Sequence, residues 1–221
     1  RRSISCSGVA VGRATPSGRW IWKHELPTPI EDVAIGSEGF SAATTGDGRL
    51  LVFDPAGEPS QTGGFDAADP PFLIEAPEGS PAGLSWITLA RRAQQLCGHG
   101  LRGEVVWARR LPWEGWSLAR LGPFAVVTSA DGRAMAFDGA GDVRAEAAPS
   151  GAVNDVFGLD GDGRLVRIVR KEVHILCAGL DGRVRWRVVA PQAVGPCAAG
   201  KAGVAVMIGH DLAWFRQAGA S

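Results

Sequence analysis

Three segments of this chain contain a glycine, a tryptophan four residues later and a proline five residues after the tryptophan. This triplicated spacing constrains the fold more than any other feature, because it requires three copies of one structural unit. Related glycine turns without the tryptophan lie between the copies and after the last one. The full segments are Gly18-Trp22-Pro27, Gly103-Trp107-Pro112 and Gly182-Trp186-Pro191, and the further turns are at Gly57, Gly141 and Gly219.

The six glycines are separated by 39, 46, 38, 41 and 37 residues. A period near forty, combined with strand-like segments, indicates an all-β fold: a β-propeller built from four-stranded antiparallel blades. We expect residues 1–221 to form a single propeller domain with six blades, while five blades or a fragment of a larger ring remain alternatives. The first unit lacks an inner strand and the last lacks its outer strand. Either residues outside this chain complete the ring or the termini meet in one composite blade.

Two further patterns support the blade register. The motif Asp-Gly-Arg-x-x-x-Phe-Asp-x-Ala-Gly begins at Asp47 and again at Asp131, 84 residues later, which indicates duplication of blade pairs. The apolar spacing of residues 86–96 would suit a helix. The repeat register instead requires two strands there with a turn near Arg91-Arg92, and we favour the strands. We also expect a short first strand over residues 7–11.

Apolar runs such as residues 50–53, 124–127 and 204–208 predict inner strands that are buried on both faces. The tryptophan strands alternate instead, which is typical of an outer strand with one face against a neighbouring blade. A buried tryptophan removes about 150–250 Å² from water, and its loss costs roughly 3–5 kcal/mol. We therefore predict that three tryptophans are structural staples between blades. They are Trp22, Trp107 and Trp186.

At residues 47–57 and 182–186 the chain resembles the PQQ-like and WD40-like β-propeller repeat proteins. A fainter similarity is to the propeller component of bacterial systems that pair a MoxR-type ATPase with a von Willebrand factor A protein. The resemblance implies an architecture rather than an activity. Quinone-dependent members of the PQQ-like family use a vicinal disulfide, and this chain has no Cys-Cys pair, so no cofactor is expected.

Composition narrows the possible partners. The chain has 23 basic and 23 acidic residues, so no broad basic field for nucleic acid is expected. No apolar run approaches the roughly 18 residues of a membrane helix, so we expect no membrane insertion. No signal peptide is visible, which favours the cytoplasm. The sequence begins with Arg1 rather than Met, which is consistent with a trimmed native start.

The sequence contains no convincing catalytic or metal-binding motif. The Asp160–Gly163 segment resembles a calcium loop, but Lys171 occupies the twelfth position, where a bidentate Glu is needed. Cys97 and His99 have no second pair of ligands at metal spacing. The four histidines are scattered, and we expect no metal. The four cysteines are interpreted as small core residues; they are Cys6, Cys97, Cys177 and Cys197.

The loops that join blades and the hairpins between second and third strands should share one face. That face should include Glu58–Pro71, Lys171-Glu172 and the connection from Arg109 to Trp116. Trp and Arg are enriched at binding hot spots, although Trp116 could also be a core residue of a first strand. The candidate interface residues are Arg91, Arg92, Arg109, Arg110, Trp113 and Trp116.

These observations predict a non-catalytic β-propeller scaffold that binds another protein. The first alternative is an enzyme at the mouth of the central channel, such as a metal-assisted hydrolase. The second is a propeller that binds sugars or small ligands between blades. That reading would require equivalent pockets in several blades, and the loops are unequal.

Overall fold

The computed structural model describes residues 3–66, 69–149, 156–159, 165–171, 174–179, 183–192, 194–200 and 203–216. Apart from one short 3-10 turn at Ser37–Gly39, the elements in these ranges are β-strands. The chain forms two compact units, one of Arg1–Val127 with Phe137–Asp142 and one of Thr128–Ala136 with Val143–Ser221. The described ranges include no helix long and apolar enough to cross a membrane. A single domain over residues 1–221 stays a prediction.

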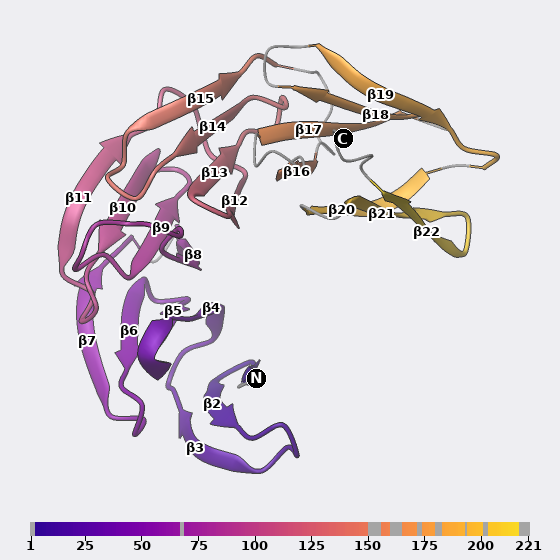
Figure 1. The fold of residues 1–221 in the computed structure, drawn as a ribbon. Coiled ribbons are helices and arrows are strands. Elements are labelled where there is room, and N and C mark those ends of the chain that lie inside the picture. The colour runs from indigo at the N-terminus through magenta and orange to yellow at the C-terminus, as the bar shows by residue number, and fades with distance from the viewer. Residues whose placement is uncertain are drawn as a thin grey trace. The chain divides into compact units, whose positions relative to one another are not determined.

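The strands form six antiparallel sheets, here numbered in chain order, and each sheet follows the sequence as a meander (Figure 1). Sheet 1 contains β1 (Ser3–Ser7), β2 (Ala10–Ala14) and β3 (Trp20–Glu25). Sheet 2 contains β4 (Ile30–Ile35), β5 (Ser41–Thr45), β6 (Arg49–Phe53) and β7 (Pro59–Gly64). Sheet 3 contains β8 (Phe72–Glu75), β9 (Trp86–Ala90), β10 (Gln95–His99) and β11 (Val105–Arg110).

The second half of the chain continues the same plan. Sheet 4 contains β12 (Ser117–Leu121), β13 (Phe124–Thr128), β14 (Ala134–Phe137) and β15 (Val143–Ala147). Sheet 5 contains β16 (Val156–Leu159), β17 (Leu165–Lys171), β18 (His174–Gly179) and β19 (Val184–Val189). Sheet 6 contains β20 (Val194–Gly200), β21 (Gly203–Ile208) and β22 (Asp211–Arg216). Among the described residues, four sheets therefore have four strands, and the first and last have three, in line with the incomplete terminal units of the sequence. A six-bladed ring stays a prediction.

The ambiguous segment at 86–96 forms two strands, as the repeat register predicted. β9 pairs with β10 in antiparallel register, and Leu89 lies opposite Leu96. All five residues of β9 are buried, which explains the helix-like spacing: a strand covered on both faces has no polar side to reveal its period.

The expected strand at residues 7–11 is wrong. β1 ends at Ser7 and β2 begins at Ala10, and the hairpin between them contains Gly8 and Val9. Gly8 has φ 58°, a left-handed conformation that suits glycine and interrupts a strand. The Ser-Gly pair is therefore a turn signal inside what looked like an apolar run.

Sheet 2 packs against sheets 1 and 3, and sheet 5 packs against sheet 6. Leu50 and Val52 of β6 pack with Leu73 and Trp86 of sheet 3. Phe53, on the opposite face of the same strand, packs with Val11 and Trp22 of sheet 1. Both faces of this inner strand are thus covered, which is the arrangement that its apolar sequence predicted. In the second unit, Ile168 and Cys177 of sheet 5 share a core with Val206 of sheet 6.

The duplicated Asp-Gly-Arg motif builds the same hairpin twice. Between β5 and β6, the Thr45 hydroxyl donates to Asp47 (2.5 Å), and Asp47 forms an ion pair with Arg49 at 2.9 Å. Ser129, Asp131 and Arg133 repeat these contacts between β13 and β14. The hydroxyl hydrogen bond is the main cause that holds the pKa of each aspartate below its usual value. The residues that the two repeats share therefore specify a turn rather than a binding site.

Candidate protein-binding face

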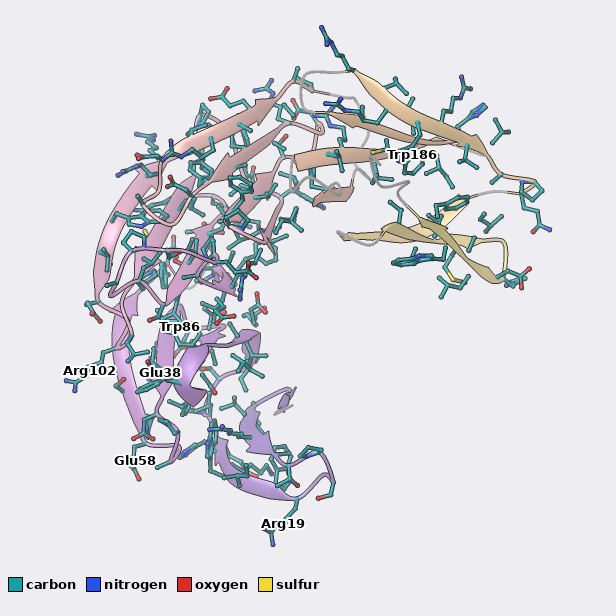
Figure 2. The ribbon with its side chains drawn as sticks, in the orientation of Figure 1. Arg19, Glu38, Glu58, Trp86, Arg102 and Trp186 are labelled. Atoms are coloured by element: carbon teal, nitrogen blue, oxygen red, sulfur yellow. The ribbon has the colours of Figure 1, made fainter. Side chains whose placement is uncertain are left out.

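Each of the three repeated tryptophans contacts the sheet that follows its own. Trp22 stacks on Phe53 of sheet 2, with ring centroids 5.2 Å apart. The Trp107 indole nitrogen donates to the Gly139 carbonyl at 3.0 Å, in the turn between β14 and β15. Trp186 stacks on Phe215 of sheet 6 at 6.4 Å (Figure 2). The structure thus places all three at junctions between consecutive sheets.

Glycines of the following sheet receive two of these rings. A Cβ atom added to Gly57 would lie 2.5 Å from Cγ of Trp22, and one added to Gly141 would lie 2.9 Å from the Trp107 ring. Both glycines also have positive φ, 95° and 78°. The sequence needs glycine there for two reasons, namely the turn conformation and the close approach of the ring.

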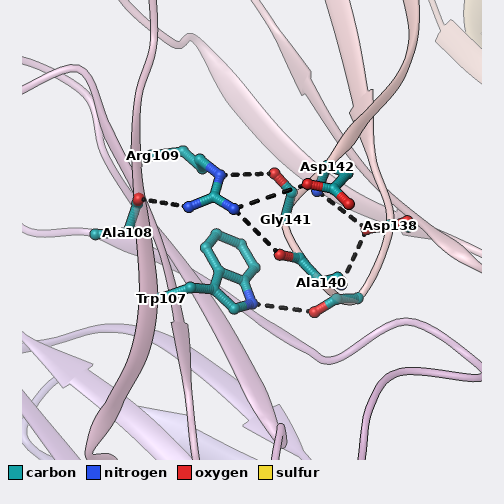
Figure 3. A network of polar contacts seen from close by, with 8 residues as sticks. Trp107, Ala108, Arg109, Asp138, Ala140, Gly141 and Asp142 are labelled. Atoms are coloured by element: carbon teal, nitrogen blue, oxygen red, sulfur yellow. Dashed lines mark hydrogen bonds and ion pairs between the residues drawn. The ribbon is translucent and has the colours of Figure 1, made fainter.

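Arg109 belongs to the Trp107 junction (Figure 3). Its Nε donates to the Gly141 carbonyl at 3.0 Å, and its Nη2 lies 3.8 Å from Asp142 Oδ1. The guanidinium carbon also lies 5.8 Å from the centroid of the Trp107 ring. These contacts give Arg109 a role in joining sheets 3 and 4, and its side chain remains 43% exposed, so its interface role stays a prediction.

Arg91 and Trp116 come together with an aromatic ring that the sequence analysis did not single out. The Arg91 guanidinium carbon lies 5.4 Å from the ring centroid of Phe72 and 5.9 Å from that of Trp116. Trp116 is 51% exposed, which does not fit a first-strand core position. We call Phe72, Arg91 and Trp116 the Arg91 cluster. It presents one half-exposed indole that a cation holds in place.

Hydrogen bonds fix the turn that carries Arg91. Residues 91–94 connect β9 and β10, and the Gln94 amide donates to the Arg91 carbonyl at 3.0 Å. The Leu111 amide donates to the Gln94 carbonyl at 2.7 Å, which ties the turn to the link between β11 and β12. The buried Asp69 accepts the Ala93 amide at 3.0 Å from the link between β7 and β8. Hydrogen bonds with two links therefore fix the hairpin that carries Arg91, and one of these links also contains Trp116.

The other candidates have different settings. Arg92 and Arg110 are exposed, and Trp113 is half-buried in the link that leads to Trp116. Leu111, at the start of that link, is only 2% exposed and anchors it. The side chain of Lys171 and all of Glu172 lie outside the described residues.

Sequence reasoning missed a pocket between sheets 1 and 2. It has a volume of about 240 Å³. Its apolar wall comes from Leu26 and Pro27, which follow β3, and from Leu51 and Pro59 of sheet 2. The polar residues at its edge are Thr28, Thr45 and Arg49. The repeated Trp-to-Pro spacing was the available signal, since it places a Leu-Pro pair beside the next sheet.

His99 is buried, and both of its ring nitrogens lie within hydrogen-bonding distance of other protein groups. His99 is 1% exposed; its Nε2 lies 2.8 Å from the Thr88 hydroxyl and its Nδ1 lies 3.1 Å from the Gly103 carbonyl. Burial lowers its pKa. The part of the chain that the structure describes contains no group of three or more His, Cys, Asp or Glu residues that could hold a metal ion. The Asp160–Gly163 segment falls outside that part.

The buried cysteines fit their expected core positions. Cys97 is 5% exposed and Cys177 is 0% exposed. Desolvation raises the pKa of the Cys97 thiol, which disfavours the reactive thiolate. The side chains of Cys6 and Cys197 lie outside the described residues.

No family model and no curated protein matches the chain. The β-propeller domain of Cps50 (Swd1) from Myceliophteria thermophila matches with a TM-score of 0.68 at 11% identity, over 93% of this chain and 75% of that one. BBS1N, crystallised in complex with ARL6DN, matches with a TM-score of 0.63 at 15% identity, over 96% of this chain and 72% of its own. Streptogramin B lyase matches with a TM-score of 0.63 at 12% identity, over 96% of this chain and 78% of its own.

At these identities the matches show the fold alone. They agree with the four-stranded antiparallel meanders and with the spacing of the glycine turns. The protein has the β-propeller fold.

Proposed function

We propose that this chain is a non-catalytic β-propeller scaffold that binds another protein through the Arg91 cluster. The observation that carries the proposal is the half-exposed indole of Trp116 beside the Arg91 guanidinium. A large aromatic ring that is already positioned loses little conformational entropy when a partner covers it. Tryptophan and arginine are also the residue types that dominate binding energy at protein interfaces.

The support beneath the cluster favours the same function. The hairpin at 91–94 accepts a hydrogen bond from the Leu111 amide and donates one to Asp69, so Arg91 lies beside the Trp116 ring on a fixed backbone. Exposed Arg92, which follows Arg91 in the chain, adds a second positive charge to the same hairpin. This combination suits a partner surface with an apolar recess that is bordered by acidic groups. Among proteins of similar fold, BBS1N was crystallised with a protein partner.

The test begins with affinity purification of the tagged protein from its source cells and identification of stoichiometric partners by mass spectrometry. Binding is then measured with purified components. We expect Trp116→Ala to weaken the affinity by about tenfold or more. The unfolding midpoint should stay close to that of the unmodified protein, because half of the ring is already in water.

Trp214→Ala is the matched control, because Trp214 on β22 is 53% exposed, nearly the same as Trp116. It should change the affinity by less than about threefold. Full affinity of Trp116→Ala, or equal losses in both variants, would contradict the assignment of this face.

A further inference from the structure

The pocket between sheets 1 and 2 has the size of one large side chain rather than of a small-molecule ligand. Its volume of about 240 Å³ lies below the roughly 300–1,000 Å³ of typical ligand sites. Leu26 and Leu51 line the pocket and also pack on the core around Trp22 and Phe53. The pocket is thus a recess above a rigid core.

The internal repeat shows what such a recess can contain. The Trp107 repeat lies 85 residues after the Trp22 repeat, and its hairpin motif lies 84 residues after the first. At these offsets, Leu26 and Pro27 correspond to Leu111 and Pro112, and Thr45 and Arg49 correspond to Ser129 and Arg133. The chemistry of these positions is maintained. Thr28 is different, because its counterpart is Trp113.

The small residue at position 28 therefore coincides with an open pocket, and the other repeat places an indole at the same position of its own link. Thr28 uses its hydroxyl to donate to Asp47 at 3.2 Å, which holds the link against the hairpin. The Trp113 side chain is half-buried. We infer that the space beside Thr28 is complementary to a large aromatic side chain.

Charge at the edge of the pocket adds a second requirement. Arg49 is the one charged residue among those that line it. Its Nε pairs with Asp47, and among the described residues its two terminal nitrogens make no ion pair, so they are available to a ligand. In the Trp107 repeat an acidic residue, Glu114, directly follows Trp113. A carboxylate after the aromatic residue would complement Arg49.

We propose that this pocket binds a partner segment in which a large aromatic side chain is followed by a carboxylate. The proposal rests on the scaffold function and adds a second contact site with its own ligand chemistry. The aromatic ring would fill the space beside Thr28, and the carboxylate would accept from Arg49.

The probe is the capped peptide Leu-Pro-Trp-Glu-Gly, which copies residues 111–115. A fluorine label on its tryptophan separates its NMR signal from the eight tryptophans of the protein. We expect saturable binding with a Kd of about 1 mM or tighter. Replacing the peptide tryptophan with alanine should abolish saturation. Replacing its glutamate with glutamine should weaken binding about two- to fivefold.

Two variants of the protein separate filled space from lost hydrogen bonding. Thr28→Trp fills the pocket with the residue of the other repeat and should weaken binding by about tenfold or more. Thr28→Val loses the same hydrogen bond to Asp47 without filling the space, so its affinity should stay within about twofold. Arg49→Gln should remove the preference for the glutamate peptide over the glutamine peptide.

Absence of saturation with the unmodified protein, or equal losses in Thr28→Trp and Thr28→Val, would overturn the proposal. Both results would leave the Trp116 experiment unaffected, because that experiment measures different residues with the native partner. The scaffold function and the pocket therefore succeed or fail separately.

Discussion

The Trp22 and Trp107 repeats share one sequence pattern, but different contacts hold their tryptophan side chains. Trp107 donates its indole hydrogen to the Gly139 carbonyl. The equivalent carbonyl in the first repeat belongs to Pro55, and it accepts a hydrogen bond from Arg13 at 3.4 Å instead. The Trp22 indole nitrogen has no hydrogen-bond partner among the described residues. Trp22 therefore depends on stacking, and Trp107 on a hydrogen bond and the contact of its ring with the Arg109 guanidinium.

The comparison also separates scaffold positions from surface positions. The glycines, tryptophans and Asp-Gly-Arg turns that the repeats share all join sheets or close hairpins. Two positions that differ lie in or beside the links between sheets. Thr28 and Trp113 occupy the same place in two links, and Glu31, near the start of β4, corresponds to Trp116 in the link before β12. Duplication has thus maintained the framework, while the link residues diverged. Candidate binding residues are best sought where the repeats disagree.

The largest expected effect is the loss of either ring. Trp22→Ala and Trp107→Ala should each lower the free energy of unfolding by about 3–5 kcal/mol, since each leaves a cavity at a junction. Urea unfolding, followed by circular dichroism, measures both. Trp214→Ala, at a 53% exposed position, is the control and should cost less than about 1 kcal/mol. A cost below that limit at Trp22 or Trp107 would show that the ring is not a staple.

Substitution by phenylalanine tests the difference between the contacts of Trp22 and those of Trp107. Trp22→Phe and Trp107→Phe remove similar volume, but only the second loses a hydrogen bond seen in the structure. Trp107→Phe should therefore cost about 1 kcal/mol more than Trp22→Phe. The same urea titrations provide this difference. Equal costs, or a larger cost at Trp22, would refute the distinction between stacking and hydrogen bonding.

The smallest expected effect is a pH dependence of stability that arises from the Trp107 repeat and has no counterpart in the Trp22 repeat. His99 corresponds to Ala14 in the first repeat. Burial holds the pKa of folded His99 below its usual value of 6.5, so the unfolded chain binds the proton first as the pH falls. Its contribution to stability is complete above the unfolded pKa and decreases as the pH drops below about 6.5.

Unfolding free energies measured between pH 7.5 and about 5 test this dependence. His99→Gln should flatten the decrease in stability toward acidic pH, because glutamine can hydrogen-bond to Thr88 but does not titrate there. His174→Gln is the control for a histidine that is not fully buried. An identical pH profile for the unmodified protein and His99→Gln would exclude the buried imidazole as the source.

Most of the framework could be predicted from the sequence because it depends on local chemistry. The Gly-to-Trp spacing and the Asp-Gly turns located the hairpins, and the register correctly divided residues 86–96 into β9 and β10. The turn at Gly8 was missed because its neighbours are apolar enough to resemble a strand. Local patterns identify strands well only when the turn signal is stronger than the apolar run.

The candidate site was less predictable because it depends on distances between elements. Arg109 looks like a surface charge on an exposed strand, and only the position of the Gly141 carbonyl reveals its structural role. Phe72 joins Arg91 and Trp116 from an earlier strand, which no spacing rule indicates. The pocket beside Thr28 is a space between sheets, and no residue type encodes it.

The two buried thiols allow the local unfolding of each compact unit to be measured by chemical modification. Cys97 lies in one compact unit and Cys177 in the other, and neither is more than 5% exposed. A thiol reagent can modify such a side chain only after its sheet opens, so each modification rate reports the opening free energy of one unit. With Cys6 and Cys197 replaced by serine, equal rates would indicate that the two units open as one cooperative structure. Unequal rates would identify which of the two units opens more readily.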